Sequence, residues 1–185
     1  MIKHPSYFSL YEIALLSLFG ALAFVIRMAI KIPLHIPGNS GILWVLPVII
    51  GTALVRKPGA GTYVGIVSGL LASFFGLEAL HVFDILKYTA MGVTVDLVSM
   101  TFGYRLDHPV VGFIAGAAGN LVKMVVNYAV HLFLGVQGTF ILIGIGASSV
   151  THLVFGGLGG ILAALIVGRL CRAGVVHQDD VPDDG

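Results

Sequence analysis

The sequence predicts an all-α integral membrane protein, a single bundle of six transmembrane helices. Hydrophobic residues make up 57% of the 185 residues, and charged residues only 10%. Mean hydropathy is +1.01, which is far above that of soluble domains. Because the ionisable residues fall mostly in short stretches between long apolar runs, the exterior is expected to face lipid.

Apolar runs separated by turn residues predict where the helices lie. We expect them near residues 9–31, 41–55, 59–76, 80–103, 109–134 and 139–170. The apolar run of the first helix is preceded by Lys3, His4 and Glu12 and is too long for the core of a signal peptide, so it should remain as a helix. The second is short for a full span, but Gly41 and the run Arg56-Lys57-Pro58-Gly59 mark its ends sharply.

The helices are expected to form one domain over residues 1–173, followed by a disordered acidic tail over 174–185. No internal repeat is visible, so a transporter built from inverted repeats within this chain is not expected. Cys171 is the only cysteine, which excludes an intramolecular disulfide and a cysteine-based metal site. The net charge of +1 offers no basic field for nucleic acid.

The basic residues predict the orientation in the plasma membrane. One side carries Lys3, Arg56, Lys57, Arg105, Arg169 and Arg172, against Lys31 and Arg27 on the other. The richer side should be cytoplasmic. Both termini are then cytoplasmic, and residues 32–40, 77–79 and 135–138 form outer loops.

Polar residues inside the expected spans concentrate on two helices. In the fifth helix, Asn120, Lys123, Asn127 and His131 fall within about 80° of one another at roughly 100° per residue. In the outer half of the fourth helix lie His81, Asp84, Lys87 and Tyr88. Ionisable groups in a membrane are costly and usually face the bundle interior, so each is a functional candidate.

Two interpretations of these residues are open. They could join helices, with Asp84 or the deeper Asp96 paired with Lys123. Their number and their concentration towards one membrane face favour a half-buried pocket instead. Carboxylate, ammonium, imidazole and amide groups suit a small polar or zwitterionic organic molecule better than a bare ion.

The first outer loop and the start of the next helix, residues 32–44, form the most distinctive segment, since they combine two prolines with two glycines. It could fold over the pocket as a lid, with Asn39, Ser40 and Trp44 contacting the ligand. A rigid turn with an interfacial tryptophan is an equal alternative. His35 is not expected to bind a metal, because no spaced His or Cys accompanies it.

One motif suggests catalysis. The run Gly38-Asn39-Ser40-Gly41, with His152 in the sixth helix, resembles elements of rhomboid intramembrane serine proteases. In that family the serine opens a helix within the fourth span of the core, whereas Ser40 precedes the second helix here. A rhomboid-like protease using Ser40 and His152 is therefore the alternative function, and we expect no enzyme.

Nearly the whole chain resembles the substrate-binding S components of energy-coupling factor (ECF) vitamin transporters. The resemblance rests on the length, the six spans, the Ile-Pro-containing first loop, and the run from Leu46-Pro47 through 56–61 to Val64-Gly65. It implies an outward-facing vitamin pocket under the first loop, a membrane coupling subunit and two cytoplasmic ATPases as partners. The chain has no Walker A motif, so any ATP chemistry must lie in those partners, and no cofactor is expected in this chain.

The resemblance also implies a docking surface and a class of cargo. The family often has Ala-x-x-x-Ala in the first helix for docking to the coupling subunit. The corresponding small residues here are Ala14, Ser17, Gly20 and Ala21, with close packing inside the bundle as the rival explanation. Similarity around residues 56–59 to the thiamine-precursor branch favours thiamine- or hydroxymethylpyrimidine-like cargo, while riboflavin, cobalamin and haem stay open.

Overall fold

The computed structural model describes residues 7–29, 39–76, 80–135 and 138–174. These residues form six α-helices and a short 3-10 helix, and they contain no strand, which confirms the all-α prediction. The elements are α1 (Leu10–Ala29), α2 (Gly41–Val55), α3 (Ala60–Phe75), η1 (His81–Phe83), α4 (Asp84–Thr101), α5 (Pro109–Phe133) and α6 (Gly138–Arg172). The predicted acidic tail lies outside the described residues, apart from Gly174.

Local sequence explains where α1 and α5 begin. Ser9 and Glu12 form a reciprocal capping box, in which the Ser9 N–H donates to Glu12 Oε2 over 2.7 Å and the Glu12 N–H donates to Ser9 Oγ over 3.2 Å. Lys57 Nζ lies 2.9 Å from Glu12 Oε2 and joins this end of α1 to the α2–α3 turn. At α5, His108 caps the helix and Pro109 occupies its first turn.

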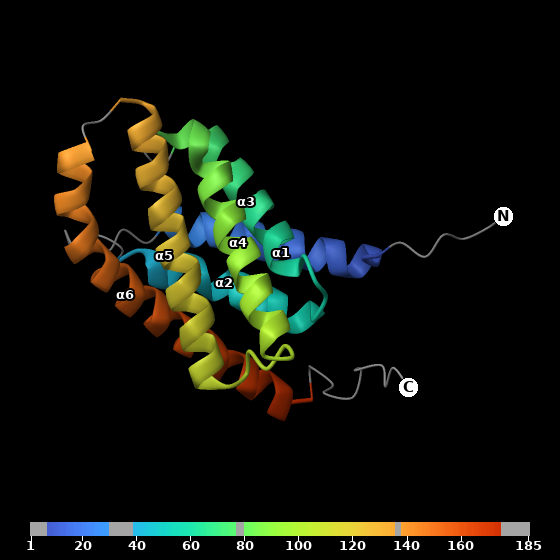
Figure 1. Cartoon of the computed structure of the whole chain (residues 1–185). Helices are drawn as coiled ribbons and strands as arrows, with labels where there is room; N and C mark the ends of the chain where they lie inside the picture. The colour runs from blue at the N-terminus through green and yellow to red at the C-terminus, as the bar shows by residue number, and fades with distance from the viewer. Residues whose placement is uncertain (1–6, 30–38, 77–79, 136–137, 175–185) are drawn as a thin grey trace.

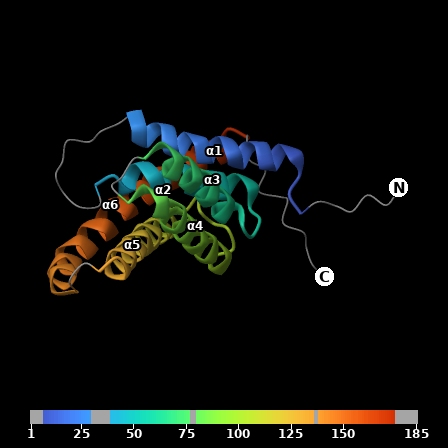
Figure 2. The same cartoon turned by 90° about the horizontal axis from the view of Figure 1, so that it is seen from above.

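The helices pack as a closed bundle around α2. Figure 1 shows α3, α4 and α5 side by side with α6 next to α5, and Figure 2 shows α1 along one edge, over α2 and α3. α2 packs against each of the other five helices. Most of its 15 residues are buried, and the buried residues, which include Trp44, Val48 and Ile49, lie on all sides of the helix. This position explains why α2 is short and apolar around its whole circumference.

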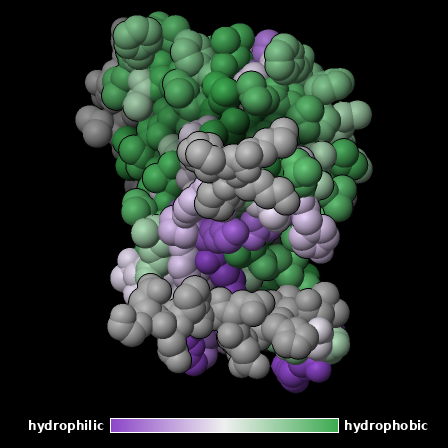
Figure 3. Space-filling view, turned by 90° about the vertical axis from the view of Figure 1, so that its right-hand side faces the viewer, coloured by the Kyte–Doolittle hydropathy of each residue, from purple (hydrophilic) through white to green (hydrophobic). Residues whose placement is uncertain are grey.

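The outer surface of the bundle is apolar over most of its height. Among the described residues, three helical segments are long and apolar enough to cross a membrane, namely Leu10–Ala29, Pro109–Phe133 and Ser148–Arg172. Leu18, Val25 and Phe74 are more than half exposed. Figure 3 shows hydrophobic residues over the upper part of one face, with hydrophilic residues gathered below them. The protein is therefore embedded in the membrane, as the composition predicted.

Glycines bring α3 and α4 into backbone contact. A β-carbon added at Gly61 would lie 2.9 Å from the Gly92 carbonyl oxygen, and one added at Gly69 would lie 2.8 Å from the Cα atom of Ile85. Small residues allow such approaches between membrane helices, where no hydrophobic effect drives association. The close contact fixes α4, and hence its polar residues, against α3.

Asp96 serves the same helix pair by capping α3 from α4. Its carboxylate is buried and accepts hydrogen bonds from the Gly61 N–H over 2.8 Å, the Thr62 N–H over 2.7 Å and Thr62 Oγ1 over 2.6 Å. These N–H groups belong to the first turn of α3 and have no acceptor within their helix. The idea that Asp96 pairs with Lys123 is thus corrected, because its oxygens are committed to the start of α3.

We expect Asp96→Ala to lower the free energy of unfolding by about 1–3 kcal/mol, because it leaves buried donors without an acceptor. Denaturant titration in detergent micelles would measure the loss. Asp107→Ala is the matched control, since the described residues offer the Asp107 carboxylate no hydrogen bond. Equal stability of the two variants would contradict the capping role.

Candidate functional site

A cluster of buried polar and aromatic side chains lies near the predicted outer end of the bundle. At this end α2 and α4 begin, and α1 and α5 end. Asp84 and Lys87 are 1% exposed or less, and Lys87 Nζ lies 2.6 Å from Asp84 Oδ1. Both residues belong to the first turn of α4, and their spacing of three residues places them on one face. A buried ion pair at this depth is costly to desolvate, so it calls for a functional explanation.

Lys123 of α5 reaches the same region between two aromatic rings. Its Nζ lies 4.5 Å from the ring centroid of Trp44 and 4.3 Å from that of Tyr88, and it donates to Tyr88 Oη over 2.9 Å. The two rings pack against each other with centroids 4.2 Å apart. Cation–π attraction and this hydrogen bond stabilise the buried ammonium.

Arg27 of α1 completes the cluster and was not among the predicted site residues. Its guanidinium carbon lies 5.9 Å from the centroid of the Trp44 ring. Arg27 Nε and Trp44 Nε1 are both buried, and neither has a hydrogen-bond partner among the described residues. Arg27 lies near the end of a predicted span, where the sequence alone suggests an arginine at the membrane interface. It reaches Trp44 because α1 crosses over α2 in the structure.

Asn120 connects the start of α2 to α5 and α6. Its side-chain N–H donates to the backbone oxygen of His152 over 2.9 Å. The Asn120 amide lies so close to Gly41 that a β-carbon there would overlap it. A side chain at position 41 would therefore push the Asn120 amide away from its bond to the His152 backbone, so Asn120 has a structural role.

The other predicted site residues make local contacts. His81 Nδ1 bonds to the backbone oxygen of Ser73 over 2.9 Å, and His131 Nδ1 bonds to that of Asn127 over 2.7 Å. Asn127 and His131 are half-buried, one and two turns beyond Lys123 along α5. Asn39 and Ser40 are partly buried at the start of α2, while residues 32–38 of the proposed lid lie outside the described residues.

The geometry of His152 bears on the protease alternative. Its Nδ1 bonds to the backbone oxygen of Ser148 in its own helix over 2.7 Å. Ser40 lies just before α2, and the structure gives no hydrogen bond between its hydroxyl and the His152 ring in the described region. A serine nucleophile requires such a contact with its base, although it can be long before substrate binds.

The small residues of α1 divide between two faces. Gly20 is buried against α3, where an added β-carbon would lie 2.6 Å from Val67 Cβ. Ser17 Oγ lies 3.1 Å from Tyr63 Oη of α3. These two residues therefore pack against α3 within the chain, which agrees at these positions with the rival explanation of close packing inside the bundle. Ala14 is exposed and Ala21 is partly exposed, so they remain available to a partner.

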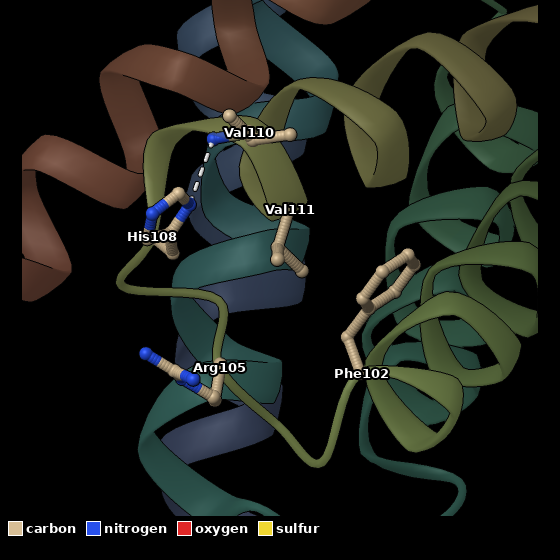
Figure 4. Close-up of a pocket in the computed structure, with 5 residues that line it drawn as sticks. All are labelled: Phe102, Arg105, His108, Val110 and Val111. Carbon is tan, nitrogen blue, oxygen red and sulfur yellow. Dashed lines mark hydrogen bonds between the residues drawn. The ribbon is translucent and has the colours of Figure 1, made fainter.

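A separate cavity of about 320 Å³ lies at the opposite end of α4, around the turn into α5. Figure 4 shows Val111 and Phe102 facing each other, with Arg105 and His108 projecting from the turn. The His108 Nδ1 atom accepts from the Val110 N–H over 3.3 Å and is used as a helix cap. This cavity contains none of the predicted site residues.

Comparison with known proteins gives the class of the fold. The structure is similar to a crystal structure of an S-component of an ECF transporter, with a TM-score of 0.64 and 19% sequence identity, over 91% of this chain and 88% of that one. The helical bundle is therefore the fold of an S component.

The family model for the permease component of ABC-type cobalt transport systems matches residues 10–122. The chain belongs to this family of membrane transport proteins. Comparison with curated proteins gives no significant match.

Proposed function

We propose that this protein is the substrate-binding subunit of an ECF-type importer. It captures a small water-soluble organic molecule, a vitamin or vitamin precursor, at the outer end of the bundle. The observation that carries the proposal is the buried cluster of Asp84, Lys87, Tyr88, Lys123 and Trp44 in the S-component fold. Charged groups so placed within a membrane bundle typically mark a substrate site.

Transport would depend on partners, since the chain itself has no nucleotide-binding motif. A membrane coupling subunit and two cytoplasmic ATPases would drive release of the cargo inward. The exposed Ala14 and the neighbouring outer face of α1 offer the coupling subunit a close approach. Both termini would lie in the cytoplasm, and Figure 1 shows that α1 begins and α6 ends towards the same side.

The family description names cobalt, but the cluster suits a bare divalent cation poorly. Lys87 and Lys123 bring two ammonium groups into it, against the single carboxylate of Asp84. Divalent metals are bound by carboxylates, carbonyls and imidazoles rather than by ammonium groups. An organic cargo is therefore the better candidate, and the thiamine-like cargo suggested by the sequence remains a prediction.

The proposal predicts that the protein copurifies with a small molecule whose affinity depends on α5. We expect Asn127→Ala and Lys123→Met to weaken binding of that molecule about 5- to 150-fold, because each removes a contact worth roughly 1–3 kcal/mol. Calorimetry with the copurified molecule would measure the change, after mass spectrometry has identified it. Uptake into proteoliposomes should require the coupling subunit and ATP.

Thr101→Ala is the control, since Thr101 is exposed at the far end of α4 and should leave affinity unchanged. Wild-type affinity in both α5 variants would mean that Lys123 and Asn127 contribute to helix packing and not to ligand binding. Uptake that needs no ATPase would overturn the importer assignment, and peptide cleavage abolished by Ser40→Ala would support the protease instead.

A further inference from the structure

We infer that the outer site contains an anion subsite formed by Arg27 and Trp44, and that the cargo carries an ionised acidic group. This inference rests on the proposed function, because the subsite belongs to the proposed cargo site. It names a chemical class of cargo and a residue, Arg27, that the sequence did not single out.

The first support is a pair of neighbouring donors without acceptors. Trp44 is fully buried, yet its Nε1–H has no hydrogen-bond partner among the described residues, and the same is true of the buried Arg27 Nε–H. A buried donor without an acceptor costs about 1–3 kcal/mol, so such groups mark a place where a ligand or ordered water supplies the acceptor. The guanidinium beside the indole presents a planar set of donors that matches a carboxylate or phosphate.

The second support is the charge balance at this end of the bundle. Among the described residues Arg27, Lys87 and Lys123 carry positive charge, and Asp84 alone carries negative charge. The outer connections that lie outside the described residues add one basic residue, Lys31, and one acidic residue, Glu78. They leave the excess of positive charge unchanged. An anionic cargo would offset that excess in a region of low dielectric, where it is most costly.

The subsite can be tested without knowing the cargo, because Trp44 is the only tryptophan in the chain. Its fluorescence would be quenched with iodide, caesium and acrylamide at matched ionic strength, using full-length protein freed of cargo. We expect the quenching constant for iodide to exceed that for caesium. A unit charge about 6 Å away changes the local concentration of a monovalent ion roughly threefold or more, even at the dielectric of water.

The variants separate Arg27 from general effects of folding. Arg27→Gln should lower the iodide constant at least about threefold, Arg27→Lys should retain it, and Arg172→Gln at the other end of the bundle should leave it unchanged. Caesium or cobalt(II) quenching as strong as that by iodide would overturn the subsite. Failure of all solutes to reach Trp44 would overturn it as well.

Two further arms identify the source of the anion and separate this inference from the proposed function. If iodide quenching disappears in nanodiscs of phosphatidylglycerol but persists in phosphatidylcholine, the site binds a lipid headgroup and the inference about cargo fails. ATP-dependent uptake of an uncharged or cationic cargo, such as thiamine itself, would keep the importer and overturn the anion subsite. A preference for iodide without any ATP-dependent uptake would keep the anion subsite and overturn the importer assignment.

Discussion

Gly156→Leu is expected to separate α5 from α6 and to prevent recovery of folded protein. A β-carbon added at Gly156 would lie 2.6 Å from Asn120 Cβ and would overlap the carbonyl oxygen of Gly116. Gly160 faces Gly112 in the same way one turn further along. The Gly116 carbonyl is backbone, and the position of the Asn120 Cβ atom is fixed by its backbone, so neither can rotate away. We expect a cost of about 3 kcal/mol or more.

The same helix offers a matched control. Gly146 also lies in α6, but an added β-carbon there meets nothing within 4 Å. Gly146→Leu should therefore fold normally, and its better helix propensity should slightly favour the helix. Size-exclusion chromatography and thermal unfolding in detergent would compare the variants. A monodisperse Gly156→Leu protein with wild-type thermal stability would show that α5 and α6 do not need this contact.

The helix order and most helix ends could be predicted from sequence, because each apolar run is bounded by glycine, proline or charged residues. The 15-residue α2 is an example: Gly41 and the run from Arg56 mark its ends, and both match the structure. Its central position could not be predicted. A helix that is apolar on all sides fits lipid as well as a protein interior, so only packing distinguishes the two.

The candidate site was predictable in part. The helical period places Asp84, Lys87 and Tyr88 on one side of α4, and the structure brings Tyr88 into contact with Lys123 and Trp44. The period could not show that Arg27 also reaches Trp44, because that contact depends on how α1 crosses α2. The glycine contacts between α5 and α6 depend on the relative rotation of two helices in the same way.

Lys87→Met is expected to destabilise the protein by about 3–5 kcal/mol. It removes the ammonium bonded to Asp84 Oδ1 while the carboxylate stays buried, and breaking one side of a buried ion pair is strongly unfavourable. Unfolding in mixed micelles with increasing denaturant would measure the loss. An unchanged midpoint would mean that the pair contributes nothing to the fold.

The double variant Asp84→Asn with Lys87→Met distinguishes a structural pair from a binding site. Removing both charges should restore most of the stability, because a buried pair replaced by neutral groups is often no worse than the pair itself. Affinity for the copurified ligand should nevertheless stay at least about tenfold below wild type, since the lost ammonium can no longer contact the ligand. Calorimetry with the copurified ligand would measure the affinity of the double variant. If stability and affinity recover together, Asp84 and Lys87 form only a structural pair within α4, and the ligand contacts must lie further along α5.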